Sequence, residues 1–469
     1  MPKLKKKFVK SVKKPEAKKS KPASASSEPK AKTYALVRGM HDILPRDEKY
    51  WKKCFHTAED LAAFFQFGRI ETPLLEETGL FVRSLGRGTD VVDKEMYAFE
   101  DKDGSRVCLR PEATASIARA FINSGMWNAP QPVKLWYWGP MFRHDRPQAG
   151  RYRQFFQAGF EVLGMADPAA DAEIILVAFN FYKDLGIPVE ISINSIGSLA
   201  ERDRYKEELV NYYRSKRGYL CAECKARLNR NPLRLLDCKE KDCQPVKAEA
   251  PKMIDWLGPE SSAHFTKVLE YLDELGIPYN LCHTLVRGLD YYNNTVFEVY
   301  PALTPALNTE GKTDEPVVGQ QGALGGGGRY DGLIEQMGGR ATPGLGMALG
   351  IDRSILAWKQ HNEANKLVVA GNKFDIYFAQ LGEDSKRVGL RLLDSWRLAG
   401  LKVGFNFGKN SLKSQMEIAN NLKVPFVIIL GQKEVQDQTV IIRDMESGVQ
   451  EVVDQKKAEA TIKKKLEKI

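Results

Sequence analysis

The sequence lacks the features of membrane, secreted and repeat proteins. No stretch approaches the roughly 18 to 20 consecutive apolar residues that a membrane-spanning helix needs. The first residues are rich in lysine and lack the apolar segment of a secretory signal. No internal repeat is present, and no GxxxxGK(S/T) or GxGxxG motif follows a predicted strand. These absences disfavour a membrane protein, a P-loop kinase and a dinucleotide-dependent enzyme.

Cysteine is scarce and odd in number, with seven residues in the chain. An odd count without a secretory signal indicates a reducing, cytoplasmic location rather than a disulfide framework. Four of the seven form two close pairs, Cys221 with Cys224 and Cys238 with Cys243. Four thiolates so grouped can surround a tetrahedral zinc ion. Free thiols in a helical segment are the alternative, because the second spacing is loose and no histidine is interleaved.

The excess of positive charge is confined to one end of the chain. The net charge is +10, and residues 1–32 hold twelve lysines and two glutamates, which account for all of it. With its proline, alanine and serine, the segment 1–33 is predicted to be a disordered tail that adds non-specific affinity for a polyanion. A tail that only aids solubility is the alternative.

A chain of this length predicts two or three domains. Apolar residues at helical spacing predict helices over 47–66, 112–123 and 171–185. The charged, helical block 198–275 reads as an insertion, with a polar loop expected over 304–324 and a linker over 361–373. Beyond the linker, strands are predicted at 374–381, 401–407 and 425–430 and helices at 385–399 and 411–422. This alternation predicts a small α/β domain with a partly parallel sheet.

The most informative segment joins two predicted strands through a basic turn. Period-two alternation after the turn puts four residues on one face of a sheet, namely Phe155, Gln157, Gly159 and Glu161. Four arginines surround the turn: Arg143, Arg146, Arg151 and Arg153. This set suits a ligand that carries a ring, an amine and a phosphate. A solvated hairpin with a basic tip is the alternative.

Two further segments carry weaker signals. At a predicted helix start, Glu112 and Thr114 either bind a ligand or stabilise the helix N-terminus, and the second interpretation is favoured. The segment 285–292 combines Arg287 with an aspartate and two tyrosines, which a structural ion pair would also explain.

Glycine-rich elements follow. The run 325–328 permits either a flexible turn or the close approach of a ligand to the backbone. Arg353, at the point where a glycine-spaced strand is predicted to turn into a helix, could cap that helix or bind a phosphate.

Together these elements resemble the histidyl-tRNA synthetase family, which belongs to the class II aminoacyl-tRNA synthetases. The resemblance covers nearly all of residues 34–469. Motifs 1, 2 and 3 of the class are similar to the surroundings of Pro73 and to residues 142–161 and 344–353. Residues 285–292 and 326–332 are similar to the two motifs specific to histidine.

The resemblance implies an α+β catalytic core over residues 34–360, with an antiparallel sheet flanked by helices. It also implies a helical insertion over 198–275 and a C-terminal α/β anticodon-binding domain over 374–469. The implied reaction ligates L-histidine to tRNA(His) with ATP and Mg²⁺ through a histidyl-adenylate. The implied assembly is a homodimer with motif 1 at its interface.

Individual roles are implied as well. Arg143 and Arg287 would be catalytic, because they would hold the α-phosphate and the carboxylate where negative charge develops. The residues implied to bind histidine are Glu112, Ala113, Thr114, Gln157, Glu161, Arg287, Tyr291 and Tyr292. The residues implied to bind ATP are Arg143, Arg151, Phe155 and Arg353. Arg146 and Gln148 would contact the acceptor end of the tRNA.

Two rival functions are weighed against this one. A regulatory relative without catalysis is disfavoured, because such relatives lack the anticodon domain and alter the segment 285–292, and both are intact here. A synthetase for another amino acid is disfavoured by Glu161 and Tyr292, since a polar pocket rejects side chains that leave its groups unpaired.

Overall fold

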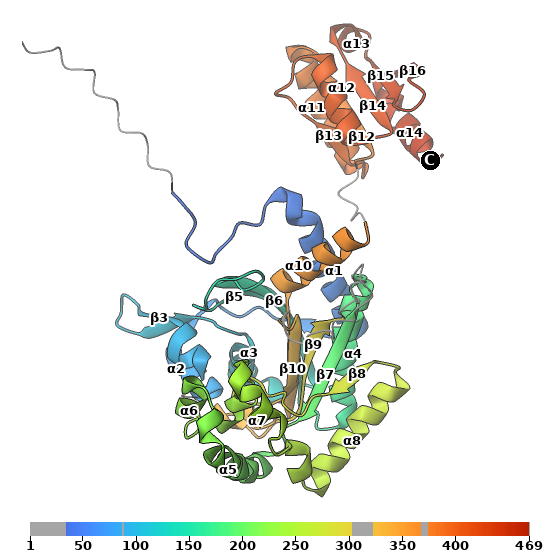
Figure 1. Ribbon diagram of the computed structural model, residues 1–469. Coiled ribbons are helices and arrows are strands. Elements are labelled where there is room, and N and C mark those ends of the chain that lie inside the picture. The colour runs from blue at the N-terminus through green and yellow to red at the C-terminus, as the bar shows by residue number, and fades with distance from the viewer. Residues whose placement is uncertain (1–33, 87–88, 303–321, 367–373, 469) are drawn as a thin grey trace, which may run out of the picture. The chain divides into compact units, whose positions relative to one another are not determined.

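The computed structural model describes residues 34–86, 89–302, 322–366 and 374–468 (Figure 1). The chain divides into Met1–Arg38 and Gly39–Ile469. In the first unit the described residues 34–38 form no helix or strand. The predicted tail over 1–33 and most of the predicted loop over 304–324 lie outside the described residues.

An eight-stranded sheet forms the centre of the larger part of the chain, in the order β1-β5-β6-β11-β10-β9-β7-β8. All neighbours are antiparallel except the outermost pairs, β1 with β5 and β7 with β8. The predicted antiparallel core is therefore confirmed. The strand bounds are β1 Gly68–Arg69, β5 Val133–Phe142, β6 Gln154–Leu163, β7 Val189–Ser195, β8 Tyr279–Leu281, β9 Asn293–Pro301, β10 Gly325–Arg329 and β11 Gly344–Gly350.

Four helices cover one face of this sheet: α1 Glu48–Phe64, α4 Pro168–Asp184, α8 Pro259–Glu274 and α10 Ile351–Ala364. The apolar residues of α1 recur at helical spacing, so that Cys54, Ala58 and Leu61 are buried together. On the sheet side, the ring of Phe156 meets Trp51 with centroids 5.0 Å apart. The helices predicted at 47–66 and 171–185 are confirmed.

Shorter elements cover the opposite face, around a second apolar core. A three-stranded sheet in the order β2-β4-β3 lies there with three helices. Figure 1 shows α2 and α3 on the side of the sheet away from α4 and α8. The bounds are β2 Leu75–Glu77, β3 Tyr97–Glu100, β4 Arg106–Leu109, α2 Thr78–Leu85, α3 Thr114–Asn123 and α9 Leu333–Gln336.

The block 198–275 is helical, as its pattern predicted. It holds α5 Leu199–Ser215, α6 Ala222–Arg227, α7 Gln244–Ala248 and α8, joined by 3₁₀ turns. Its first three helices enclose an apolar core of their own, which includes Tyr205, Leu209 and Tyr213. A capping box of Ser198 and Glu201 fixes the start of α5.

Residues 374–468 form a separate five-stranded sheet in the order β13-β12-β14-β15-β16. The first three strands are parallel, which confirms the predicted α/β pattern, whereas β15 and β16 add an antiparallel hairpin that was not predicted. The bounds are β12 Ile376–Gln380, α11 Glu383–Leu398, β13 Val403–Phe405, α12 Leu412–Asn421, β14 Phe426–Leu430, α13 Gln432–Gln436, β15 Thr439–Asp444, β16 Gln450–Asp454 and α14 Gln455–Leu466.

Two further expectations are settled by these bounds. The predicted start of the linker at residue 361 was wrong, because α10 continues to Ala364 and Asn362 is buried. Within the described ranges, every helix falls short of the length and apolar character that crossing a membrane requires.

Candidate active site

The β5–β6 hairpin presents its predicted ligand face to the second core. Phe156, Ala158 and Phe160 pack under the helices, while Phe155 and Glu161 turn the other way. Glycine on the next strand makes this possible, because Gly346 of β11 is paired with Glu161 and a Cβ there would overlap the glutamate Oε2. The alternation read from the sequence is confirmed.

Glu161 lies at the bottom of the site with its side chain fully buried. Its Oε1 accepts a hydrogen bond of 2.8 Å from the hydroxyl of Thr114, and its Oε2 accepts one from the hydroxyl of Tyr330. Burial raises the pKa of this carboxyl to about 8, although both hydrogen bonds act in the opposite direction. A carboxyl so enclosed is suited to recognise a polar N–H group.

Aromatic rings form a wall beside this carboxyl. The ring of Tyr330 meets that of Tyr291 edge-on at 5.7 Å, and Tyr291 lies 4.6 Å from Tyr292. All three rings are buried. The wall and the carboxyl together suit a small, flat, polar ring.

Glu112 stabilises the start of a helix, whereas Thr114 lies in the site. The carboxylate of Glu112 accepts from the backbone N–H of Thr114 at 2.7 Å and of Ala115 at 2.9 Å, so it stabilises the start of α3. The hydroxyl of Thr114 donates into the site instead. Ala113, also buried, lies between them.

Gln157 offers an acceptor without a partner. Its Oε1 is buried, and none of the described residues donates a hydrogen bond to it. A buried unpaired acceptor is costly unless a ligand donates to it. The position of Gln157 on β6, between Phe155 and Glu161, therefore marks where a ligand N–H group fits.

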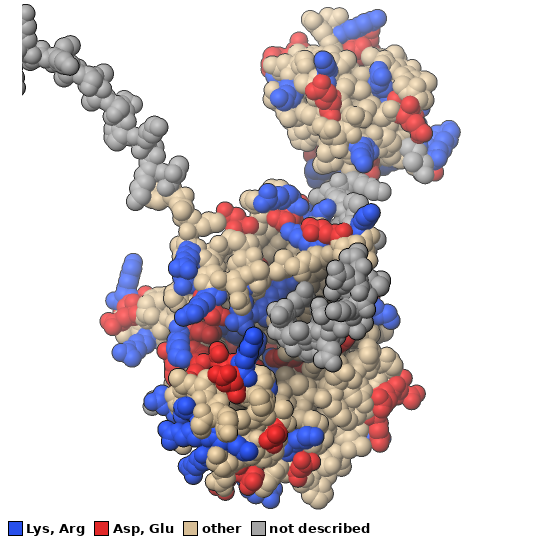
Figure 2. All heavy atoms as spheres, in the orientation of Figure 1, with Lys and Arg blue, Asp and Glu red and all other residues tan. Residues whose placement is uncertain are grey.

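Three arginines gather at the open end of the site. The guanidinium of Arg143 lies 5.5 Å from the ring centre of Phe155, and its Nε donates to the carbonyl of Pro111 at 2.8 Å. Arg353 donates to the carbonyls of Gly150 and Ala323. On the face in Figure 2, basic side chains gather in a hollow near the end of the β5–β6 hairpin.

The arginines repel one another. Burial lowers the pKa of Arg353, and the positive charges of Arg151 and Arg143 lower it further. The side chain of Arg151 is 40% exposed and pairs with Asp145 at 3.1 Å. Like charges held this close are relieved by a bound polyanion, which a triphosphate provides.

Arg287 approaches from the segment before β9. Its Nη1 pairs with Glu298 Oε1 at 2.6 Å, and its guanidinium lies 5.4 Å from the ring centre of Tyr292. The second oxygen of Glu298 accepts from the hydroxyl of Tyr300 at 2.5 Å. Burial alone would lower the pKa of Arg287, but Tyr292 and Glu298 outweigh it and raise the pKa, so the group stays charged.

The run Gly325–Gly328 is not a flexible turn. It forms most of β10, a strand paired on both sides. A Cβ on Gly326 would lie 2.7 Å from Nη1 of Arg287, and one on Gly328 would lie 3.1 Å from the ring of Tyr292. The flexible turn was therefore wrong, whereas the close approach of a ligand to this backbone stays a prediction.

The two residues expected to meet tRNA lie at the exposed tip of the hairpin. The backbone N–H of Arg146 donates to Asp145 at 2.6 Å, and Gln148 forms an isolated bridge with Arg151. They stand apart from the hydrogen bonds around Glu161.

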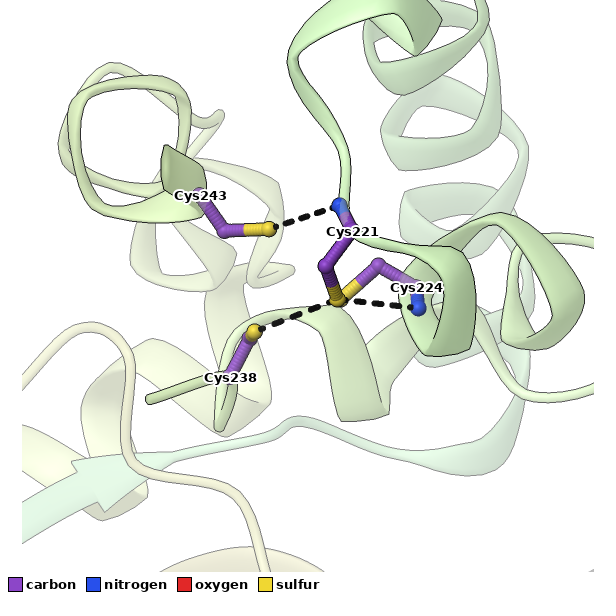
Figure 3. Close-up of side chains that lie close together, drawn as sticks. All are labelled: Cys221, Cys224, Cys238 and Cys243. Atoms are coloured by element: carbon purple, nitrogen blue, oxygen red, sulfur yellow. Dashed lines mark hydrogen bonds between the residues drawn. The ribbon is translucent and has the colours of Figure 1, made fainter. Parts of the chain in front are cut away.

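The four paired cysteines of the insertion converge. Their sulfurs all lie within 4.8 Å of one another, and those of Cys221 and Cys238 are 4.0 Å apart. Figure 3 shows Cys224 and Cys243 closing the group through contacts with Cys221. The backbone N–H of Cys221 donates to the sulfur of Cys243 at 3.2 Å. Residues about twenty positions apart thus form one cluster, three of them buried.

Comparison with known proteins identifies the family. A family model described as histidyl-tRNA synthetase matches residues 39–353, and one described as an anticodon binding domain matches residues 375–465. The chain belongs to the histidyl-tRNA synthetase family. Both matched ranges agree with the two sheets described above.

Individual relatives of this family cover nearly the whole chain. The histidine–tRNA ligase of Dehalococcoides mccartyi is 43% identical over 418 residues, which are 89% of this chain and 96% of that protein. The histidine–tRNA ligase of Desulforudis audaxviator is 45% identical over 414 residues, 88% of this chain and 94% of that protein. The crystal structure of apo histidyl-tRNA synthetase from Staphylococcus aureus superposes with a TM-score of 0.72 at 33% identity, covering 92% of this chain and all of that one.

Within the family site, sequence reasoning gave no role to Tyr330 or Glu298, although both contact predicted residues. Period-two alternation along β9 would have placed Glu298 and Tyr300 on the same face. Tyr330 follows the end of β10 directly, and Gly344 of β11 leaves room for its ring, since a Cβ there would lie 2.5 Å from that ring. Neither signal names the partner, because Arg287 and Glu161 are distant in sequence.

Proposed function

We propose a division of roles among these residues in the reaction of the family. In that reaction L-histidine is ligated to tRNA(His) with ATP through a histidyl-adenylate, and pyrophosphate and AMP are released. The observation that carries the assignment is the geometry of β6, where Phe155, Gln157 and Glu161 occupy one face between an arginine cluster and a buried carboxyl.

Histidine binds at the closed end. Glu161 accepts a hydrogen bond from an imidazole N–H, with Tyr292 and Tyr291 against the ring. Gln157, Thr114 and Glu112 take the α-amino group, beside the small side chain of Ala113. Glu112 does so with the lone pairs that its two backbone hydrogen bonds leave free. The unpaired Oε1 of Gln157 supports this orientation, since an ammonium group supplies the missing donor.

ATP binds at the open end. The adenine stacks on Phe155, while Arg143 holds the α-phosphate and Arg151 and Arg353 hold the β- and γ-phosphates. The mutual repulsion of these arginines in the free protein supports a polyanionic ligand. Mg²⁺ accompanies ATP and neutralises part of the charge on its phosphates.

Activation joins the two ends. The carboxylate of histidine attacks the α-phosphorus, and pyrophosphate leaves from the opposite side. Arg143 and Arg287 hold positive charge where the pentavalent phosphorus group is most anionic. The contact between Arg287 and Glu298 keeps that guanidinium in place beside Tyr292. The terminal ribose hydroxyl of tRNA(His) then attacks the activated carbonyl and displaces AMP.

Histidine-dependent exchange of pyrophosphate into ATP tests this function most directly. The purified protein is expected to exchange label with histidine and not with other amino acids or without one. Exchange that responds to a different amino acid would overturn the assignment of Glu161 and Tyr292 to imidazole recognition.

A structural zinc ion in the insertion is proposed separately. Tetrahedral zinc with Zn–S bonds of about 2.3 Å holds its four sulfurs about 3.8 Å apart. The spacing of Cys221, Cys224, Cys238 and Cys243 accommodates this with small movements of the side chains. Four thiolates fill the coordination shell, so the ion would stabilise the insertion core and leave no position for substrate.

Metal analysis of protein prepared without chelators is expected to find about one zinc per chain. Cys243→Ser should abolish that zinc, whereas Cys54→Ser, buried in the core beneath the large sheet, should retain it. Zinc-free wild-type protein would leave free thiols as the correct interpretation.

The domain organisation completes the proposal. Residues 34–360 form the catalytic domain with an insertion at 198–275, and residues 374–469 bind the anticodon. Arg146 and Gln148 contact the acceptor end, and a cytoplasmic homodimer forms through the surface around Pro73. Sedimentation analysis tests the last point, since a monomer at micromolar concentration contradicts it.

A further inference from the structure

The main chain of the histidine-specific segment is held by a side chain of the insertion. Arg202 lies in the first turn of α5 and is only 8% exposed. Its Nη1 donates to the carbonyl oxygen of Tyr292 at 2.5 Å and to that of Asp290 at 3.3 Å. A guanidinium thus spans the residues on either side of Tyr291.

The position of Arg202 is itself fixed from several directions. The neighbouring Glu201 accepts from the backbone N–H of Ser198 at 2.7 Å and of Gly258 at 2.5 Å, and from the hydroxyl of Ser261 at 2.7 Å. These bonds tie the start of α5 to the chain entering α8. Arg202 is therefore presented by a helix end that has little freedom to move.

Retaining a buried cation here is costly in free energy. Among the described residues no partner accepts from Nε of Arg202, and Nη1 donates to two backbone carbonyls. A guanidinium that donates to main chain rather than to a carboxylate contributes position more than ion-pair energy. What it positions is the segment just before β9, which carries Tyr291 and Tyr292 into the site.

The same segment is held at its other end. Asn194 of β7 donates from Nδ2 to the carbonyl of Leu285 at 3.0 Å. The backbone N–H of Asp290 donates to Leu85 at the end of α2. Arg202 is the charged member of this set and the one that contacts Tyr292 directly.

We propose that Arg202 is a positioning residue for amino acid recognition, through which the insertion sets the place of Tyr291 and Tyr292 against the imidazole. The inference rests on the proposed histidine site. The insertion would then contribute to the selection of the amino acid, whereas the β5–β6 hairpin would contribute to the binding of ATP.

The test is pyrophosphate exchange with Arg202→Met, Arg202→Lys and Arg204→Met. Arg204 lies on the exposed side of the same helix, so its variant is the matched control. Loss of a buried charged hydrogen bond is expected to raise the KM for histidine by about tenfold to one hundredfold in Arg202→Met. The KM for ATP should stay within about twofold, because Arg143 and Arg353 do not touch this segment.

Arg202→Lys should recover part of the histidine KM, since an ammonium group can donate to the same carbonyls but reaches less far than the guanidinium. It also carries the test if Arg202→Met fails to fold, with thermal melts as the check. Equal increases in both KM values, or a fall in kcat alone, would make Arg202 merely structural and overturn the inference. Absence of histidine-dependent exchange in the wild type would instead overturn the proposed function, and the inference with it.

Discussion

Tyr330→Phe isolates a single oxygen atom at the bottom of the site. Tyr330 is 1% exposed, and its hydroxyl contacts Glu161 Oε2 and the carbonyl of Leu345 at 3.2 Å. Phenylalanine keeps the ring against Tyr291 and removes only the hydroxyl. The change therefore leaves Glu161 in place with one hydrogen bond, from Thr114, instead of two.

The expected magnitude follows from the burial of this pair. A hydrogen bond to a buried charged group is worth about 1.5 to 3 kcal/mol, which corresponds to roughly tenfold to one hundredfold in affinity. The bond from Tyr330 lowers the pKa of Glu161, so its loss should also raise that pKa. Burial already opposes the ionised form of Glu161, and both effects further weaken the oriented carboxylate that accepts from an imidazole N–H.

The assay is pyrophosphate exchange at varied histidine and, separately, varied ATP. Tyr330→Phe should raise the KM for histidine by the stated factor and leave the KM for ATP unchanged. Tyr182→Phe is the control, because that hydroxyl is also buried and bonded, to Ser354 at 3.1 Å, but on the helix-covered face. An unchanged histidine KM in Tyr330→Phe would refute the role of Glu161 in binding the ring.

Three further outcomes are expected. Arg287→Ala should slow adenylate formation by about two to three orders of magnitude, while the Kd of histidine by calorimetry changes much less; equal losses would make Arg287 a binding residue. Burial raises the pKa of Glu161 from 4.5 to about 8, so its contribution to stability is complete below 4.5 and lost as pH rises towards 8. Thermal melts from pH 5 to 8.5 should therefore decline less in Glu161→Gln than in the wild type, and parallel curves would contradict the raised pKa. Deleting residues 1–32 removes a net charge of +10 and should flatten the salt dependence of tRNA binding without altering exchange; an unaltered slope would separate the tail from tRNA.

Local patterns in the sequence predicted those parts of the fold that depend on one element at a time. The face of β6 followed from alternation, because successive side chains of a strand point to opposite faces of the sheet whatever its partners are. The helix α1 followed from its apolar spacing for the same reason. The zinc candidates were visible as two pairs, and only the folding of the insertion brought the pairs together.

Features that depend on pairing between distant segments could not be read in this way. A strand of glycines has no side-chain pattern, so β10 was indistinguishable from a turn until β9 and β11 were seen on either side. The contact of Arg202 with Tyr292 joins residues 90 positions apart, and nothing local to either residue indicates it. The antiparallel hairpin of β15 and β16 was not predicted, although Val440 and Ile442 lie two residues apart on one buried face of β15. The regular alternation of strands and helices before it predicts a different continuation.

The β5–β6 hairpin fixes the length of the site. Phe155 and Glu161 are six residues apart on a single continuous strand, a separation of about 20 Å. The distance between the proposed adenine contact, Phe155, and the proposed imidazole acceptor, Glu161, is thus set by the rise per residue of one strand. Inserting one residue would turn every side chain to the opposite face, and inserting two would lengthen the span by about 7 Å. Substitutions at Tyr330 or Arg287 can change the width of the site. Its length, from Phe155 to Glu161, can change only by whole residues of the strand.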